Sequence, residues 1–410
     1  MLIIALTLGL IIWIAGTHSY ADSLYPDIPK NNLPKIRTLP KQGQVILDVR
    51  STVLSGDPIS QIRDSNGIYN GIKIGVFDLL NHSESIWDLP SEISLRAPIL
   101  CNSCTMRASW AATTRQLLLA TNKGAVLIDG AGHYKKLRLR MPGISIRYRD
   151  ADEFAISNDG RFLAFKVDAR DREDKALDPN DPYAKFGKLY DELIYEHTRD
   201  PKPITIAKSA IHFYGNGQPY GKFVSLPAWS PNSKRIAYAY QKRGSGFLAS
   251  AGIVIANISK QGVVVSSGTV AIPPVHQPDD ASVDELRWSP DGTQLGFVVF
   301  EYWYEHSDQY SRYTLYTVNA HGRGLKAVRF RNKNINVNAF AWSPSGQQLA
   351  LRSDYQAKKL CNSNAMFYFD TGNEPCRMSE NLFTSNVDGS GLKRISKKPD
   401  FRHGQLFWIQ

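Results

Sequence analysis

The residues that could do chemistry are scattered through this sequence. Its nine histidines form no His-Glu-x-x-His zinc motif, and no serine stands in a Gly-x-Ser-x-Gly hydrolase turn. The glycine patterns that cradle phosphates in nucleotide-binding proteins are also missing from the sequence. We therefore predict no catalytic residue and no metal-ligand set from the motifs.

One acidic segment offers oxygen ligands. Six carboxylates lie between Asp168 and Asp181, together with Arg170, Arg172 and Lys175. Calcium prefers carboxylate oxygens, but the spacing fits no EF-hand loop, and the basic residues partly neutralise the acids. A solvated acidic insertion is the favoured interpretation, with a Ca²⁺ site as the alternative. No other cofactor is predicted.

The densest group of recognition residues is aromatic. Five aromatic side chains fall within the 13 residues from Glu301 to Tyr313. Tyrosine and tryptophan bury much area at low entropic cost and dominate many interfaces. The segment is interpreted either as a binding loop or as a strand extended past its usual length, with alternate rings packed inside. The candidate binding residues are Tyr302, Trp303, Tyr304, Tyr310 and Tyr313.

Four cysteines are present, and their even number favours disulfides in an oxidising compartment. Cys101 and Cys104 have the C-x-x-C spacing without the surroundings of a thioredoxin-type site, and Cys361 and Cys376 lie 15 residues apart. The pairing stays open. Two alternatives to structural disulfides are a redox-active pair at Cys101 and Cys104 and a zinc site with all four thiolates.

The N-terminus is typical of an exported protein. Residues 2–15 form an apolar stretch, short for a membrane span, and Ser19 and Ala21 place small residues before a cleavage point. We expect residues 1–21 to be a signal peptide and residues 22–40 an N-terminal extension. The chain is then periplasmic or secreted and not an integral membrane protein, with an uncleaved anchor as the alternative.

The net charge of +11 invites a nucleic-acid interpretation, because 49 Lys and Arg stand against 38 Asp and Glu. An exported chain does not meet chromosomal DNA, and no known nucleic-acid-binding module is recognisable. The composition, 42% hydrophobic, is that of a globular protein and excludes a disordered or collagen-like chain. We predict no nucleic-acid partner.

A repeated hairpin determines the expected fold. Trp229, Trp288 and Trp342 each open a Trp-Ser-Pro turn that is followed by an apolar run. Ile156 opens a copy that keeps the turn without the tryptophan, and Trp110 opens one that keeps the tryptophan and loses the turn. Proline and glycine at these positions favour a tight turn between two strands.

Each copy continues into two more strands, so the unit has four strands, A to D, with the tryptophan at the end of strand A. Units of four strands around an axis form a β-propeller. Residues 404–410 match strand A alone, and residues 44–50, 72–78 and 85–89 supply strands B, C and D of the same unit. We predict an all-β, six-bladed propeller over residues 41–410, with seven blades as the alternative.

In this numbering, blade one joins both chain ends, and blades two to six follow in sequence order. The predicted structural anchors are Trp110, Trp229, Trp288, Trp342 and Trp408. Long B–C connections at residues 51–71, 168–191 and 354–381 would emerge on one face, which is therefore the predicted binding face.

The D strands carry much of the basic charge. Lysine and arginine alternate with leucine over Lys136–Arg140, and similar residues follow in blades five and six. Charges on an outermost strand block edge-to-edge aggregation. The alternative is a basic rim that attracts anionic envelope components. The residues in the two later blades are Arg323, Lys326, Arg329, Arg331, Lys393, Arg394, Lys397 and Lys398.

The repeat resembles that of the TolB family. The Trp-Ser-Pro-Asp-Gly hairpin at Trp288 and the segment 381–396, which contains Asp-Gly-Ser-Gly-Leu, carry this resemblance. It implies a periplasmic, non-enzymatic propeller that binds a protein or envelope component through its loop-rich face, and we expect the chain to be a monomer. The separate α/β domain of TolB itself has no counterpart in this sequence. An enzyme or a glycan or peptide binder that uses the central channel is the alternative.

Overall fold

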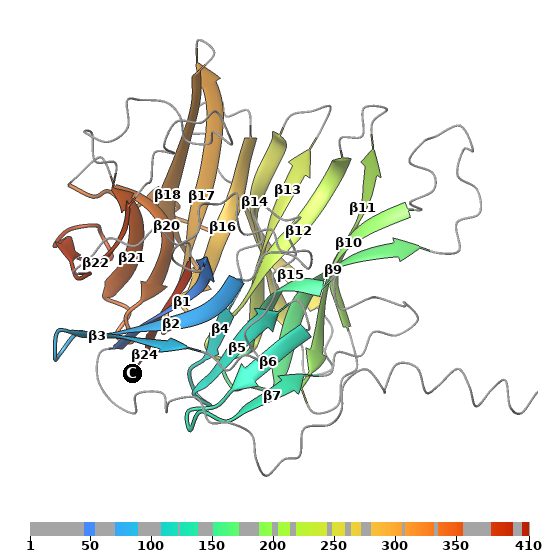
Figure 1. Ribbon diagram of the computed structural model, residues 1–410. Helices are drawn as coiled ribbons and strands as arrows, with labels where there is room; N and C mark the ends of the chain where they lie inside the picture. Colours follow the sequence, from blue (N-terminus) through green and yellow to red (C-terminus); the bar gives the residue numbers. More distant parts are fainter. Residues whose placement is uncertain are drawn as a thin grey trace, which may run out of the picture. The chain divides into compact units, whose positions relative to one another are not determined.

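The structure is a computed structural model that describes residues 45–53, 70–88, 108–121, 124–137, 151–171, 188–198, 204–213, 219–243, 248–258, 264–271, 280–305, 308–331, 335–355, 379–396 and 404–409. Every regular element in these ranges is a β-strand (Figure 1). No helix in them is long and apolar enough to span a membrane. The predicted signal peptide, the extension and all four cysteines lie outside the described residues.

The first three blades follow the predicted four-strand plan. Blade one consists of β24 (Gly404–Ile409), β1 (Val45–Val53), β2 (Asn70–Asp78) and β3 (Ser83–Asp88). Blade two consists of β4 (Ala108–Ala111), β5 (Gln116–Thr121), β6 (Gly124–Ile128) and β7 (Tyr134–Leu137). Blade three consists of β8 (Ala151–Ile156), β9 (Phe162–Asp171), β10 (Lys188–His197) and β11 (Ile204–Phe213).

The other three blades have the same order, and Ile211–Phe213 of β11 also pair with Pro219–Gly221 of the first strand of blade four, which joins blades three and four into one eight-stranded sheet. Blade four consists of β12 (Pro219–Trp229), β13 (Arg235–Arg243), β14 (Leu248–Ile258) and β15 (Val264–Ala271). Blade five consists of β16 (Asp280–Trp288), β17 (Gln294–Glu305), β18 (Asp308–Asn319) and β19 (Lys326–Ala327). Blade six consists of β20 (Ile335–Trp342), β21 (Gln348–Tyr355), β22 (Ser379–Asn386) and β23 (Lys393–Arg394). The prediction of a six-bladed propeller is confirmed.

The A–B turn explains why the hairpin repeats. Its fourth residue has a positive φ, which glycine adopts without strain, as Gly292 does at +70°. In that turn the Gly292 N–H donates to the carbonyl of Ser289, and Asp291 accepts the Ser289 hydroxyl at 2.6 Å and the Thr293 N–H at 3.0 Å. These bonds to the carboxylate hold the pKa of Asp291 below its ordinary value.

Blade two keeps this turn, so the sequence prediction that it is lost there is wrong. Residues 112–115 form the turn, with Arg115 at φ 51° in the position of glycine. Ser233 fills the same position in blade four at φ 55°. A non-glycine residue can adopt the left-handed conformation at a cost of about 1–2 kcal/mol, so the motif tolerates the loss of its glycine.

Ser233→Gly is expected to raise the free energy of unfolding by about 0.5–1 kcal/mol, because it relieves the left-handed strain but adds freedom to the unfolded chain. Ser233 is buried, and its hydroxyl has no hydrogen-bond partner among the described residues, so little is lost with it. Urea denaturation measures the change. Gly292→Ser in the matching turn of blade five should have the opposite sign, and stabilisation by both substitutions would contradict the explanation.

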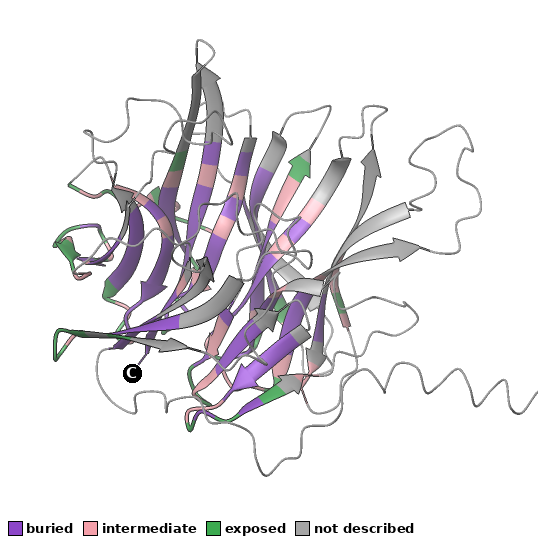
Figure 2. Ribbon diagram, viewed as in Figure 1, coloured by how far each residue is buried: buried purple, intermediate pink, exposed green. Residues whose placement is uncertain are grey.

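The core lies between neighbouring blades because side chains alternate along each strand. Leu295, Phe297 and Val299 of β17 pack with blade four, while Val298 packs with blade six. Purple, buried segments therefore run along the strands of the blades in Figure 2. The four tryptophans at the inner-strand ends of blades four, five, six and one are each 6–8% exposed, whereas Trp110 is only half-buried.

The ring closes through the two chain ends. β24 lies beside β1 (Figure 1) and pairs with it in antiparallel register. Trp408 is opposite Ile46 in this ladder. Between blades one and two, the Ala108 N–H donates to Oε1 of Gln405. The last strand of the chain thus supplies the inner strand of a blade whose other three strands come from the N-terminal region, as predicted.

Of the two interpretations of the aromatic segment, the extended strand is confirmed and the loop is not: residues 301–305 and 308–313 belong to strands β17 and β18, which form a long hairpin. The D strands of blades five and six have only two residues each, Lys326–Ala327 and Lys393–Arg394. Arg323 lies in the turn before β19, and Arg329 and Arg331 lie beyond the end of that strand, while Lys397 and Lys398 are outside the described residues.

Candidate functional site

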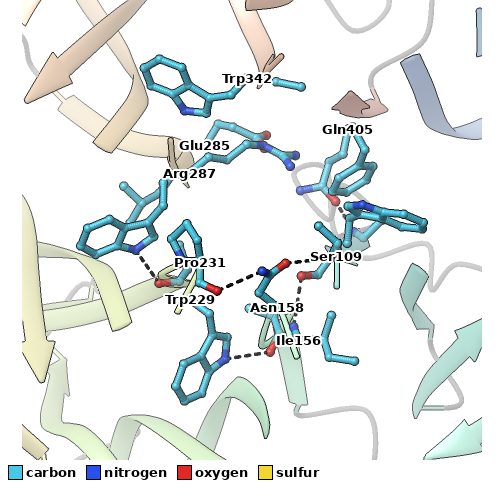
Figure 3. A pocket seen from close by; sticks show the side chains of 18 of the residues that line it. Ser109, Ile156, Asn158, Trp229, Pro231, Glu285, Arg287, Trp342 and Gln405 are labelled. Carbon is cyan, nitrogen blue, oxygen red and sulfur yellow. Dashed lines mark hydrogen bonds and ion pairs between the residues drawn. The ribbon is translucent and has the colours of Figure 1, made fainter. Parts of the chain in front are cut away.

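The main candidate site is a cavity of about 350 Å³ on the propeller axis. Its walls come from the inner strands of all six blades and from several A–B turns (Figure 3). Since strand B runs antiparallel to strand A, the A–B turns lie at the opposite end from the B–C connections. The cavity therefore belongs to the end of the channel away from the predicted loop-rich face.

Small residues make room for this cavity. The residue just before each inner-strand anchor lines it, and four of the six are alanine or serine. Larger side chains at these positions would fill the axis. The set, in blade order from two to six and then one, is Ser109, Ala155, Ala228, Arg287, Ala341 and Phe407.

An ion pair provides the strongest polar feature of the wall. Arg287 and Glu285 lie two residues apart on β16, with 2.5 Å between Nη2 and Oε1. Their side chains are 18% and 7% exposed, and the guanidinium lies 4.5 Å from the ring centre of Phe407. A pair this far from water needs good geometry to offset its desolvation, and the cation–π contact adds to it. The pair is held in place without a net charge.

A second carboxylate joins two blades across the wall. Glu153 of β8 accepts a hydrogen bond at Oε2 from the Leu226 N–H of β12, at 2.5 Å. Both residues have φ 54° at irregularities where their strands leave the ladder register. Left-handed residues other than glycine are costly and concentrate at functional sites. Two residues of the channel wall thus have a left-handed backbone conformation that the repeated hairpin does not itself require.

Polar groups near the turns fix the cavity's rim. Asn158 accepts the Ala112 N–H at 2.8 Å and donates through Nδ2 to the Pro231 carbonyl at 2.9 Å, so it joins blades two, three and four. Ser109 accepts the Ile156 N–H at 3.1 Å. Because these bonds cross between blades, the rim is preorganised before any ligand arrives.

The indole N–H groups divide into two kinds. Those of Trp229 and Trp288 donate to the carbonyls of Ala155 and Ala228 in the preceding blade, at 3.3 and 3.0 Å. Those of Trp342 and Trp408 have no hydrogen-bond partner among the described residues, although both side chains are buried at the cavity. A buried donor without an acceptor costs about 1–3 kcal/mol, which a ligand carbonyl could recover.

The aromatic residues predicted from the sequence lie elsewhere, on the β17–β18 hairpin. Trp303 is paired with Tyr310 in the ladder. Tyr313 is half-buried, contacts Phe300 at 4.7 Å between ring centres and packs towards blade six. Tyr313, the predicted aromatic whose side chain the structure describes, does not line the axial cavity.

No sequence motif predicted Glu153, Glu285 and Arg287 as site residues. The signal was present, since each stands one or three residues before an inner-strand anchor. Alternation places such positions on the channel side of strand A. Among the described residues, no three His, Cys, Asp or Glu side chains form a group that could hold a metal ion. Asp168–Asp171 end strand β9, and the rest of the acidic segment lies outside the described residues.

No protein-family model matches this sequence, and no curated protein matches it. Among solved structures, a putative TolB from Agrobacterium tumefaciens is similar at 14% identity and a TM-score of 0.44, over 89% of this chain and 91% of that one. The acylaminoacyl peptidase of Pyrococcus horikoshii is similar at 11% identity and 0.43, over 90% of this chain and 53% of that one. The oligogalacturonate lyase of Vibrio parahaemolyticus has 10% identity and 0.36, over 78% and 93%. At these values the similarities carry no argument about function.

Proposed function

We propose that this chain is a non-enzymatic, periplasmic, TolB-like propeller that binds a segment of a partner protein in its axial channel. The observation that carries the proposal is the preorganised cavity, to which the inner strands of all six blades contribute. The Trp-Ser-Pro-Asp-Gly repeat supports the family resemblance, and the apolar N-terminal stretch supports export.

The chemistry of the wall suits a polypeptide segment. Peptide carbonyls could accept from the indole N–H groups of Trp342 and Trp408, which have no partner among the described residues. Peptide N–H groups could donate to the carboxylates of Glu153 and Glu285. The neutralised ion pair and the indole walls offer polar and apolar contacts together, as ligand sites in proteins commonly do.

The test is affinity capture from a solubilised envelope extract with the channel mouth blocked. Ala112 is exposed in the A–B turn of blade two and lines the cavity, so Ala112→Trp narrows the mouth without disturbing the core. We expect the proteins retained by the wild-type chain to fall at least about tenfold, which corresponds to about 1.4 kcal/mol of binding free energy.

The matched control is Thr114→Trp, since Thr114 is exposed in the same turn but does not line the cavity. It should retain the same proteins as the wild-type chain. Equal retention by Ala112→Trp, or no specific protein in any capture, would contradict the proposal. A loss confined to Trp303→Ala and Tyr304→Ala would instead assign binding to the β17–β18 hairpin.

A further inference from the structure

A second cavity, of about 390 Å³, lies where the ring closes between blades six and one. Blade one contributes the turn between β2 and β3, and blade six contributes β22, β23 and the start of β21. It shares only Trp408 with the axial cavity. The lining residues are Phe77, Asp78, Leu79, His82, Ser83, Gln348, Thr384, Lys393, Arg394, Ile395 and Trp408.

Hydrogen-bond donors dominate the polar part of this lining. Lys393 and Arg394 come from β23, and His82 and the Ser83 hydroxyl come from the facing turn. Thr384 lies opposite Lys393 in the ladder and adds a second hydroxyl. Lys393 makes no ion pair with any residue that the structure describes. Lys393 and Arg394 are both exposed on β23, and Arg394 also donates through Nε to the Ser396 carbonyl at 3.0 Å. Cations from blade six and donors from blade one therefore border one open space.

Among the described residues that line the cavity, Asp78 has the one carboxylate, and this carboxylate accepts hydrogen bonds from its own turn. Asp78 accepts the N–H groups of Leu80 and Asn81 at Oδ1, both at 3.0 Å, and the Asn81 side-chain amide at Oδ2, at 2.7 Å. The bonds from the Asn81 side chain and backbone, with that from Leu80, lower the pKa of Asp78. The lysine, arginine and aspartate side chains of the lining are Lys393, Arg394 and Asp78, and their net charge is positive.

At the corresponding place between blades four and five, the protein's own Arg235 side chain packs between the blades. There the Arg235 guanidinium lies 4.6 Å from the ring centre of Trp288 and donates to the carbonyls of Gly292 and Ala320, at 2.9 and 3.3 Å. In blade six the residue at the position of Arg235 is Gln348, five residues after the turn serine. Blade five also has a neutral amide at this position, Gln294, so the cations that line the closure cavity are Lys393 and Arg394 of β23.

We infer that this closure cavity binds an anion of the phosphate class, either as a free phosphorylated compound or as the headgroup of a phospholipid. Lysine and arginine form short, charge-assisted hydrogen bonds to phosphate oxygens, and hydroxyls complete the shell. The volume accommodates the phosphate with part of the group that carries it. Because the site joins blades six and one, bound anion would also stabilise ring closure.

The test is calorimetric titration of the full chain with inorganic phosphate against sodium chloride at equal ionic strength. One saturable site is expected for the wild-type chain, with a matching rise in its melting temperature. Lys393→Gln should weaken phosphate binding at least about tenfold, since it removes a charge-assisted bond. Arg394→Gln should also weaken binding, while both variants keep the wild-type circular dichroism spectrum.

The matched control is Lys326→Gln, because Lys326 lies opposite Thr317 in blade five as Lys393 lies opposite Thr384 in blade six. It should bind phosphate like the wild-type chain. No saturable phosphate binding, or an equal loss in Lys326→Gln, would overturn the inference.

Cosedimentation with phosphatidylcholine vesicles, with and without phosphatidylglycerol, separates the two sources of phosphate. Binding to the anionic vesicles that Lys393→Gln abolishes assigns the site to a lipid headgroup. Phosphate binding without vesicle binding assigns it to a soluble phosphorylated compound. The channel variant Ala112→Trp leaves this cavity intact, so failure of either proposal can be told from failure of the other.

Discussion

Deletion of residues 404–410 is expected to abolish the cooperative unfolding transition of the propeller. It removes β24, whose Leu406, Phe407, Trp408 and Ile409 are all buried. Truncating one such side chain typically costs about 2–5 kcal/mol, and a whole domain has only about 5–15 kcal/mol of stability. The deletion also leaves the inner edge of β1 unpaired, while β2 still pairs with its other edge.

The deletion is measured by circular dichroism during thermal and urea denaturation. A synthetic peptide of residues 404–410 supplied in trans should restore part of the transition, and the same peptide with alanine at Leu406 and Trp408 should not. A deletion variant that unfolds as cooperatively as the full chain would contradict closure through β24.

Trp288→Ala is expected to lower the free energy of unfolding by about 3–5 kcal/mol. The side chain is 7% exposed and packs between blades four and five. Its indole donates to the Ala228 carbonyl at 3.0 Å, and the Arg235 guanidinium lies over the ring. The substitution therefore leaves a cavity, an unsatisfied carbonyl and a guanidinium without its aromatic partner.

Urea denaturation followed by tryptophan fluorescence and circular dichroism measures this loss. Trp110→Ala is the matched control, because Trp110 occupies the corresponding position in blade two but is only half-buried. Its effect should be clearly smaller. Equal effects of the two substitutions would show that burial does not determine how much the tryptophan contributes to stability. No loss for Trp288→Ala would contradict its role as a buried anchor.

Much of the fold follows from short-range chemistry, which is why the sequence predicts it. The Trp-Ser-Pro turn requires a positive φ at its fourth residue, and the strands beside it alternate in hydrophobicity. The match of residues 404–410 to strand A alone requires a partner from the N-terminal region, and β1 provides it. Such constraints act within a few residues of each other or through one repeated pattern.

The candidate site is harder to predict from the sequence than the fold, because its geometry depends on where the inner strands of six blades meet. Arg287 is two residues from Glu285, so their ion pair could be foreseen, but its packing on Phe407 comes from the closing strand. The contact of Glu153 with the Leu226 N–H depends on strand irregularities in two blades. Residues 301–313 could be predicted as a candidate because their aromatic side chains are clustered within one short stretch of sequence. The residues that line the channel come from six distant segments, so no short stretch shows them together.

The most direct test of binding in the channel is photo-crosslinking in cells that export the chain, with p-benzoylphenylalanine placed at Ala112. The same residue at Tyr304 reports on the β17–β18 hairpin, and at Thr205, exposed on β11, it reports on the outer surface. Binding in the channel predicts a discrete protein adduct from position 112 and none from position 205. An adduct from position 304 alone, or no adduct from position 112, would contradict it.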